Sequence, residues 1–354
     1  MLFSVKRLTK KYMRKTIKDV AKASNVSIAT VSLVLHNNER ISLETKRRVR
    51  KSIKQLNYHP SRSAQGLVSR KTGNIGFIVT EEHFLRTEPF YTRVFLGSEF
   101  EARENDYYVL LATIKSSFKK GDPLPRFILE KNFDGIVIAG KVPEAFIESL
   151  LKYKMPIVFI DYVPPFGDFP SVLIDNLRGG ILATEHLINK GYKNIAFIGG
   201  EISHPSIRER LQGYKLALER ANIYNSNGNG LVVTNDEHLS RQNGYRSAEK
   251  LFLHNKDVTA IFASNNATAV GVIQYLKDNN FNIPNDISLI GFDDIEADMM
   301  IDPPLTTIRV PKVEMGTEAV QLLLNIIKTK NYTAKKILIP IELVVRESIK
   351  NINY

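Results

Sequence analysis

The fold of the first part of this chain is decided by TIKDVAKASNVSIATVSLVLHN at residues 16–37, RISLETKRRVRKSIKQLNYHP at residues 40–60 and SRSAQGLVSRKTG at residues 61–73. Thr16 stands before an apolar-periodic run and has an acid three residues later, which is typical of the cap at the start of a helix. A similar cap stands before each of two further apolar-periodic runs. The spacing predicts three short helices, of which the first two form a helix-turn-helix.

The second predicted helix carries the side chains that we expect to read DNA. Ser27 can cap this helix, and Val31, Val34 and Leu35 recur at the spacing of a face directed toward a small core. In a helix-turn-helix, the N-terminal residues of the second helix face base edges in the major groove. The residues expected there are Ser27, Ile28, Ala29, Thr30, Ser32 and Leu33.

The net positive charge of the chain comes from this first segment. Residues 1–72 hold 18 Lys and Arg against three Asp and Glu, a net charge of +15, whereas the whole chain carries +12. Residues 73–354 therefore carry a net charge of −3. A basic helix is often only a solvated face, but here the basic residues coincide with the helix-turn-helix pattern. That coincidence indicates neutralisation of DNA phosphates.

The composition argues against catalysis and against metal or cofactor binding. Cysteine is absent, which excludes disulfides and thiolate sites, and the seven histidines show no metal-binding spacing. The chain has no P-loop, no GxSxG and no complete GxGxxG motif. It also has no apolar run of about 18 residues, the length needed to span a membrane. We therefore expect a cytoplasmic protein that is not an enzyme and holds no cofactor.

From Gly73 onward the pattern changes to short apolar runs that alternate with helix-length segments. The runs are NIGFIV, YYVLLATI, FDGIVIAG, MPIVFID, NIAFIGG, GLVVT, TAIFASN and ISLIGF. Continuous apolar runs of this kind indicate parallel strands buried on both faces, and hence a doubly wound α/β architecture. A segment of about 280 residues is too long for one such core and predicts two lobes.

The chain resembles the lactose repressor (LacI/GalR) family of bacterial transcription regulators in four segments: TIKDVAKASNVSIATVS, NYHPSRSAQGL, SLIGFDD and PLTTIR. The resemblance implies a helix-turn-helix head, a hinge, and an effector-binding domain of the periplasmic-binding-protein type, with two lobes joined by three crossovers. It also implies a homodimer on palindromic double-stranded DNA and a small-molecule effector. The DNA contacts that it adds are Thr16, His36, Arg62 and Leu67.

By this match the chain divides into four parts. A basic tail is expected at residues 1–15, the helix-turn-helix domain at 16–60, the hinge at 61–72 and the effector domain at 73–354. The basic tail is either the product of an upstream start codon or an arm that contacts phosphates nonspecifically. Within the effector domain, the N-lobe is expected at about 73–173 and 304–332, and the C-lobe at about 174–303 and 333–354.

The hinge contains the residue that we expect to deform DNA. Pro60 ends the third helix, and the segment after it is small, polar and basic. The resemblance implies that this segment becomes helical on the operator and that Leu67 wedges into the minor groove at a base step. The alternative is that Leu67 anchors the hinge to the next domain. Gly66 costs about 1 kcal/mol relative to Ala in a helix, which lowers the stability of the hinge helix.

Leu33 departs from the family pattern, because many members carry an arginine at this position. Arginine suits bidentate contact with guanine, whereas Leu33 offers, together with Ile28 and Ala29, apolar surface for thymine methyl groups. The alternative is that Leu33 packs toward the third helix. We expect a recognition sequence without a strongly required guanine at that base pair.

The effector is expected in the cleft between the lobes, where loops leave the carboxyl ends of strands. A carboxylate and a guanidinium on opposite sides of a cleft can each grip vicinal hydroxyls, and aromatic rings can stack on a sugar face or a base. These features favour a sugar or sugar derivative, with a purine as the alternative. Taken singly, Asp293 can instead cap the next element, and Arg210 can be one more surface charge. The candidate ligand contacts are Phe90, Tyr91, Asp161, Arg210, Asn265 and Asp293.

These observations predict a ligand-responsive transcription repressor that binds DNA as a homodimer. The alternative class is a sugar-binding transport protein or a sugar-converting enzyme on the same lobes, which leaves the basic head unexplained. In the predicted mechanism, ligand in the cleft changes the relative orientation of the N-lobes across the dimer and so the spacing of the two hinges. The ligand acts either as an inducer or as a corepressor.

Leu67→Ala is expected to weaken operator binding by about tenfold or more, because the contact that offsets the cost of unstacking is lost. Ligand binding should be unchanged. Titration of labelled operator with both proteins measures the first effect, and calorimetric titration with ligand measures the second. An operator affinity equal to that of the unchanged chain would show that Leu67 is only an anchor.

Overall fold

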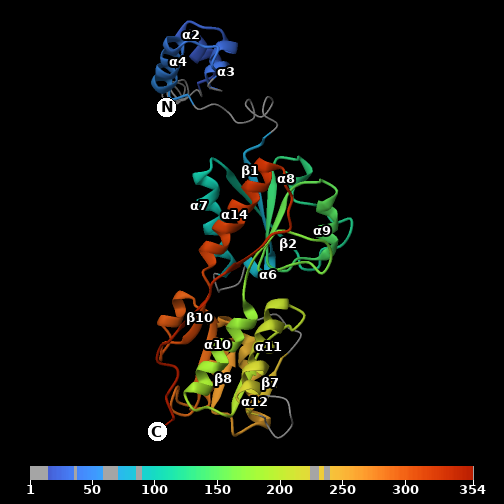
Figure 1. Ribbon diagram of the computed structural model, residues 1–354, viewed down its shortest axis with the longest axis vertical. Coiled ribbons are helices and arrows are strands. Elements are labelled where there is room, and N and C mark those ends of the chain that lie inside the picture. The colour runs from blue at the N-terminus through green and yellow to red at the C-terminus, as the bar shows by residue number, and fades with distance from the viewer. Residues whose placement is uncertain are drawn as a thin grey trace, which may run out of the picture. The chain divides into compact units, whose positions relative to one another are not determined.

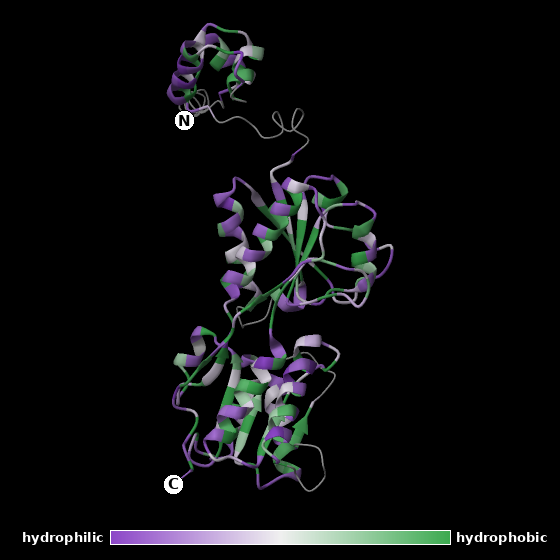
Figure 2. Cartoon of the chain, viewed as in Figure 1, coloured by the Kyte–Doolittle hydropathy of each residue, from purple (hydrophilic) through white to green (hydrophobic). Residues whose placement is uncertain are grey.

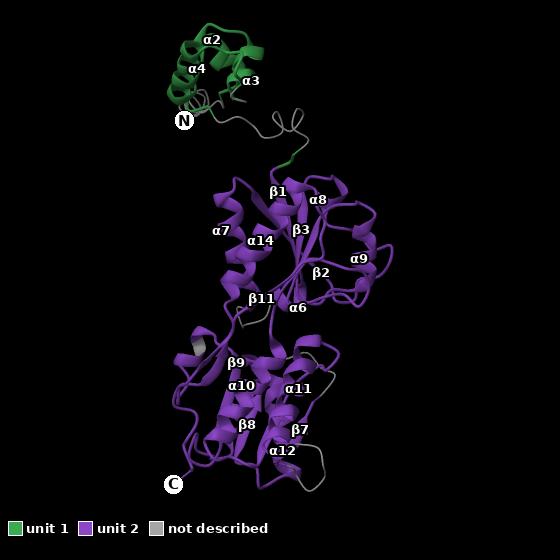
Figure 3. Ribbon diagram, viewed as in Figure 1, with its two compact units in different colours: residues 1–72 green, residues 73–354 purple. Residues whose placement is uncertain are grey.

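The computed structural model describes residues 15–35, 38–58, 71–84, 90–223, 231–234 and 240–353. The chain divides into two compact units, residues 1–72 and 73–354 (Figure 3). Most of the expected basic tail and most of the expected hinge lie outside the described residues. The same holds for three of the expected DNA contacts, which are His36, Arg62 and Leu67.

The described part of the first unit forms three helices: α2 (Ile17–Ser24), α3 (Ile28–Leu35) and α4 (Leu43–Leu56). The Thr16 amide donates to Asp19 Oδ2 at 2.8 Å, so the capping pattern expected at the start of α2 is present. The predicted three-helix head is therefore confirmed. Its small apolar core consists of Val20, Ala21, Val31, Val34, Val49 and Tyr58.

The second unit is an α/β structure, and its first lobe is built on a parallel six-stranded sheet in the order β11-β5-β4-β3-β1-β2 (Figure 1). The strands are β1 (Asn74–Thr80), β2 (Tyr108–Ile114), β3 (Gly135–Ala139), β4 (Ile157–Ile160), β5 (Ser171–Ile174) and β11 (Lys336–Ile339). The helices of this lobe are α6 (Glu81–Phe84), α7 (Phe90–Glu104), α8 (Arg126–Leu129), α9 (Glu144–Leu151) and α14 (Lys312–Thr329).

The second lobe is built on a six-stranded sheet in the order β12-β10-β9-β8-β6-β7, in which only the β10–β12 pair is antiparallel. The strands are β6 (Ile195–Ile198), β7 (Leu231–Val233), β8 (Ala260–Ala263), β9 (Ser288–Asp293), β10 (Thr306–Arg309) and β12 (Glu342–Val344). The helices are α10 (Asn176–Asn189), α11 (Pro205–Arg220), α12 (Arg241–His254), α13 (Asn266–Asp278) and the 3-10 turn η1 (Glu296–Met299).

The hydropathy of these elements explains the layered architecture. Strands in both sheets are hydrophobic, and the helices that cover them carry hydrophilic residues on their outer faces (Figure 2). All eight apolar runs of the sequence form strands, which confirms the predicted doubly wound α/β fold. Among the described helices, none combines the length and the apolar character that crossing a bilayer requires.

The exchange between the lobes differs from the expected boundaries at two strands. We expected residues 304–332 in the N-lobe, but β10 pairs with β9 in the second sheet. We expected residues 333–354 in the C-lobe, but β11 pairs with β5 in the first sheet. Both strands are short and apolar, and an apolar pattern shows that a segment is a strand without showing which sheet edge it joins. The chain therefore crosses between lobes after β5, after β10 and after β11.

Three helix pairs pack through glycines that face each other. A Cβ on Gly97 of α7 would lie 1.9 Å from the carbonyl oxygen of Val313 in α14, and a Cβ on Gly316 of α14 would lie 2.0 Å from that of Val94 in α7. Only glycine permits such a close approach of two helix backbones. Equivalent contacts join α10 to α11 and α12 to α13, and they involve Gly180, Gly213, Gly244 and Gly271.

Gly97→Ala is expected to lower the free energy of unfolding by about 1–3 kcal/mol, because the added methyl group forces α7 away from α14. Urea denaturation followed by circular dichroism measures the change. Glu104→Ala, at an exposed position of the same helix, is the matched control and should change the free energy by less than about 0.5 kcal/mol. Equal losses in both variants would mean that the glycine contact does not limit helix packing.

Candidate functional site

The exposed face of α3 is apolar and carries no charge. Ile28 and Leu33 leave 44% and 39% of their surfaces exposed, Ala29 is also exposed, and all three lie outside the core of the first unit. Leu33 therefore keeps apolar surface that the alternative of packing toward α4 would have buried. Because Ala29 and Leu33 are four residues apart on one helix, they share a face.

The polar residues at the start of α2 and α3 already make hydrogen bonds within the first unit. Ser27 Oγ accepts from the Thr30 amide at 3.0 Å and lies 2.9 Å from Thr30 Oγ1, so Ser27 caps α3 as expected. The Thr16 hydroxyl donates to Asp19 Oδ2 at 2.9 Å. Ser32 is half-buried. The surface of α3 that can contact DNA is consequently more apolar than the six residues expected to read DNA would indicate.

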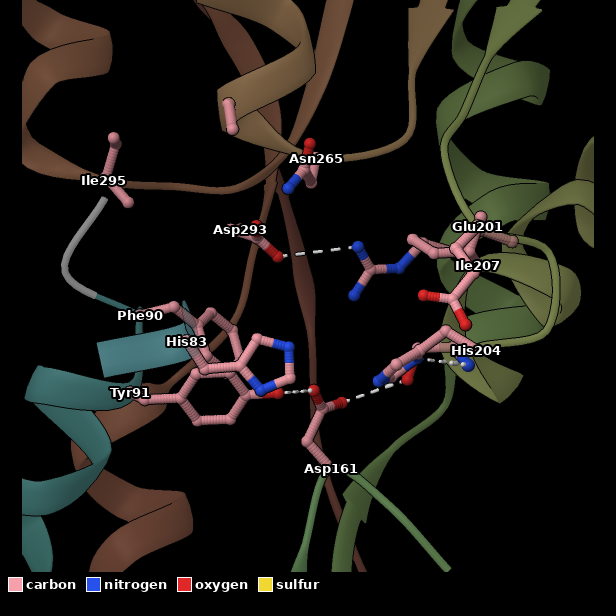
Figure 4. A pocket seen from close by; sticks show the side chains of 13 residues that line it. His83, Phe90, Tyr91, Asp161, Glu201, His204, Ile207, Asn265, Asp293 and Ile295 are labelled. Atoms are coloured by element: carbon pink, nitrogen blue, oxygen red, sulfur yellow. Dashed lines mark hydrogen bonds and ion pairs between the residues drawn. The ribbon is translucent and has the colours of Figure 1, made fainter. Parts of the chain in front are cut away.

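A pocket lies between the two lobes of the second unit, at the carboxyl ends of strands from both sheets (Figure 4). Its cavity volume is about 90 Å³. The structure brings all six candidate ligand contacts together in this pocket. The lining residues are His83, Phe90, Tyr91, Asp161, Glu201, His204, Ser206, Ile207, Arg210, Asn265, Ala267, Asp293 and Ile295.

The wall from the first lobe is aromatic and ends in a carboxylate. Tyr91 donates from its hydroxyl to Asp161 Oδ2 at 2.9 Å, as Figure 4 shows. The centroid of the Tyr91 ring lies 5.0 Å from the ring centroids of both Phe90 and His83. Asp161 directly follows β4 and has a φ of 58°, a left-handed conformation that aspartate tolerates better than most residues. This turn directs the carboxylate into the cleft rather than along the strand.

The wall from the second lobe is organised by Arg210 of α11, which is only 4% exposed. Its guanidinium donates to Asn176 Oδ1 at 2.9 Å and to the Ser264 carbonyl oxygen at 2.7 Å. It lies 3.6 Å from Asp293 Oδ1 and 3.6 Å from the centroid of the Phe292 ring. The alternative of Arg210 as one more surface charge is therefore wrong, since its guanidinium is buried and is held by groups from three other segments.

Burial sets the protonation of the groups in this wall. It raises the pKa of Asp293, while Arg210 and then Lys312 act in the opposite direction. Burial also lowers the pKa of His204, which favours the neutral ring. His204 Nδ1 accepts from the Ser206 amide at 3.3 Å, so the proton of the neutral ring is assigned to Nε2. The pocket thus combines carboxylate acceptors with guanidinium and imidazole donors.

Contacts between the lobes surround the pocket. Ser206 donates from its hydroxyl to Asp161 Oδ1 at 3.1 Å and so joins α11 to the first lobe. Lys141 Nζ lies 2.7 Å from Glu201 Oε1, and Arg93 forms an ion pair with Glu296. Both ion pairs are partly exposed and are therefore screened by salt. These polar contacts join the two lobes at the cleft.

Several lining residues were not among the candidates from sequence. Glu201 and His204 follow β6, and a polar residue near the end of a buried strand is the signal that also identified Asp161 and Asn265. Ser206, at the first turn of α11, gave no signal beyond its helix-start position. Asn265 caps α13, because its Oδ1 accepts from the Thr268 amide at 2.9 Å. Within the described ranges, no group of three acidic or histidine side chains is placed to hold a metal ion.

Known proteins match the chain in both units. The description "Bacterial regulatory proteins, lacI family" matches residues 16–61, and "Periplasmic binding protein-like domain" matches residues 184–349. The chain is 34% identical over 340 residues to the HTH-type transcriptional repressor PurR of Vibrio vulnificus, covering 96% of this chain and 99% of that protein. It is 34% identical over 312 residues to the ribose operon repressor of Escherichia coli, covering 88% and 92%. The solved transcriptional regulator CelR–cellobiose complex matches with a TM-score of 0.71 at 27% identity, covering 95% of this chain and 100% of that chain.

Arg210→Met is expected to lower the free energy of unfolding by about 3–5 kcal/mol, because it leaves the buried Asp293 carboxylate without its partner. Arg208→Met removes the same group from an exposed position on the same helix and should change the free energy by less than about 0.5 kcal/mol. Urea denaturation of the three proteins measures both values. Similar values for the two variants would mean that Arg210 contributes no more than a surface charge.

Proposed function

Because the chain belongs to the lacI family of bacterial regulatory proteins, we propose that it represses transcription by binding a palindromic operator as a homodimer, under the control of a small molecule in the interlobe pocket. One observation carries the proposal: a basic head with an exposed apolar α3 is joined in one chain to a pocket lined by buried polar groups. Neither a transport protein nor a sugar-converting enzyme requires a basic head with an exposed apolar helix. The two curated relatives described above are both named as repressors.

The charge of the pocket favours an uncharged ligand. Its lining holds the carboxylates of Asp161, Glu201 and Asp293 against the guanidinium of Arg210. A phosphate or carboxylate on the ligand would lie beside these carboxylates in a partly desolvated site, which is costly because Arg210 is already paired with Asp293 and Lys141 with Glu201. Hydroxyl groups, in contrast, can donate to the carboxylates and accept from Arg210 and His204.

A sugar or sugar derivative fits these groups best, with a neutral purine as the second candidate. Phe90 and Tyr91 offer aromatic surface on which either ligand can stack. Both classes have precedents among the similar proteins, since one curated relative is named for the ribose operon and another is named PurR.

The coupling that we propose requires two arrangements of the lobes. A ligand that contacts Asp161 on one wall and Arg210 and Asp293 on the other stabilises one arrangement over the other. In a homodimer this choice alters the spacing of the two hinges, and so the ability of Leu67 to enter the minor groove. Operator binding places this action in the bacterial cytoplasm, where the chromosome is.

The first test is capture of sheared genomic DNA from the source organism at about 0.15 M salt, a concentration at which nonspecific phosphate contacts are weakened. Sequencing of the bound fragments should show enrichment of a nearly palindromic site. The capture is repeated with D-ribose, cellobiose, adenine, guanine and hypoxanthine in turn. Release by a compound identifies an inducer, and tighter capture identifies a corepressor. The absence of an enriched site under every condition would reject the proposed function.

Asp293→Asn is expected to abolish the response to the active compound, because the substitution removes the negative charge and replaces one of the two acceptor oxygens by an NH₂ donor. Operator affinity without the compound should stay equal to that of the unchanged chain. Asp257→Asn, at an exposed position of the same lobe, is the control and should respond as the unchanged chain does. Fluorescence anisotropy of labelled operator, with and without the compound, measures the response. A normal response of the Asp293 variant would move the ligand site elsewhere.

A further inference from the structure

Lys312 is a buried lysine that the sequence analysis did not single out. It is the first residue of α14, directly after the chain crosses from β10 back to the first lobe, and it is only 7% exposed. Lysine is rarely buried to this extent without partners. Its position at a crossover places its ammonium group between the two lobes.

The partners of Lys312 are main-chain carbonyl groups. Its Nζ donates to the carbonyl oxygens of Asp293, of Asp294 at 2.9 Å and of Val310 at 3.3 Å. Asp293 and Asp294 both have positive φ angles, 99° and 54°, which residues other than glycine adopt only at a cost. The ammonium group therefore stabilises an unfavourable turn at the end of β9.

The carboxylates near Lys312 do not require it for neutralisation. Asp294 accepts from Arg309 Nε and from Arg346 Nη2, each at 2.6 Å. Asp293 has Arg210 at 3.6 Å. Since the hydrogen bonds of Lys312 go to the backbone instead, they fix the course of the chain at Asp293.

Lys312 also lies beside both walls of the pocket. Its Nζ is 5.7 Å from the centroid of the Phe90 ring, which belongs to the first-lobe wall. The carbonyl that it binds belongs to Asp293, whose side chain lines the second-lobe wall. One residue of α14 thus contacts a ligand-facing residue from each lobe.

We propose that Lys312 is a positioning residue for the ligand site, which holds the Asp293 backbone in the turn that aims its carboxylate into the pocket and links any movement of Asp293 to α14. This inference rests on the proposed function for its ligand. Its structural part concerns the chain alone. A movement of Asp293 on ligand binding would then be transmitted directly to α14 of the first lobe. It would not depend on movement of the rest of the second sheet.

The structural part is tested without ligand by hydrogen–deuterium exchange of the full chain. Lys312→Met keeps the aliphatic stem and removes the ammonium group, and Lys312→Gln keeps a shorter N–H donor. Lys328→Met, at an exposed position of the same helix, is the matched control. We expect faster exchange at residues 291–299 in the Met variant, a smaller increase in the Gln variant and none in the control. Unchanged exchange at 291–299 in Lys312→Met would overturn the proposal.

The functional part uses whichever compound of the panel above changes operator capture. Its affinity for Lys312→Met should fall by about tenfold, as expected for loss of charge-assisted hydrogen bonds, and its affinity for Lys328→Met should not change. An unchanged affinity for Lys312→Met would overturn the positioning role. If no compound of the panel acts on the unchanged chain, the proposed ligand classes fail, while the exchange experiment still decides the role of Lys312.

The pH dependence of the affinity for the ligand distinguishes a positioning role of Lys312 from general destabilisation of the fold. Asp293 faces Arg210 and Lys312, which lower its pKa, and Asp161, which raises it together with burial. Lys312 in turn faces Asp293, Asp294, Asp298 and Arg93. Removal of the ammonium group raises the pKa of Asp293, so the loss of affinity on acidification should begin at higher pH in Lys312→Met than in Lys328→Met. Identical profiles in the two variants would overturn the proposal.

Discussion

The interlobe pocket depends on the burial of one guanidinium group. Arg210 reaches from α11 to Asn176 at the start of α10, to the Ser264 carbonyl after β8 and to Asp293 at the end of β9. An unpaired charge in the protein interior costs several kcal/mol, so these segments must stay together as long as Arg210 is buried. The second-lobe wall is thus fixed by an electrostatic requirement in addition to apolar packing.

The wall from the first lobe is held by weaker constraints. Asp161 receives hydrogen bonds from the hydroxyls of Tyr91 and Ser206, of which only Ser206 belongs to the second lobe. The ion pairs that accompany this contact are partly exposed, and exposed pairs contribute little to stability in salt. Away from the buried contacts of Lys312 at the crossover, the first-lobe wall is therefore joined to the second lobe by polar contacts that are weaker than those that hold Arg210.

The sequence was informative where a single physical rule links pattern to position. Parallel strands end at one edge of a sheet, so Asp161, Asn265 and Asp293 could be placed in one cleft from their positions after apolar runs. The lobe of β10 and β11 was assigned wrongly because both sheets accept a short apolar strand. Lys312 was missed because its partners are main-chain carbonyls, and no side-chain pattern in the sequence records where those carbonyls converge.

The glycine contacts between helices have a consequence for movement. Two helices whose backbones touch through Gly97 and Gly316 cannot slide past each other without a collision, and the same holds for the pairs joined at Gly180 and Gly244. Each pair therefore moves as a single solid piece, and so does the lobe to which it is fixed. Bending between the lobes is then limited to the three short crossovers after β5, β10 and β11, which act as the hinge of the domain.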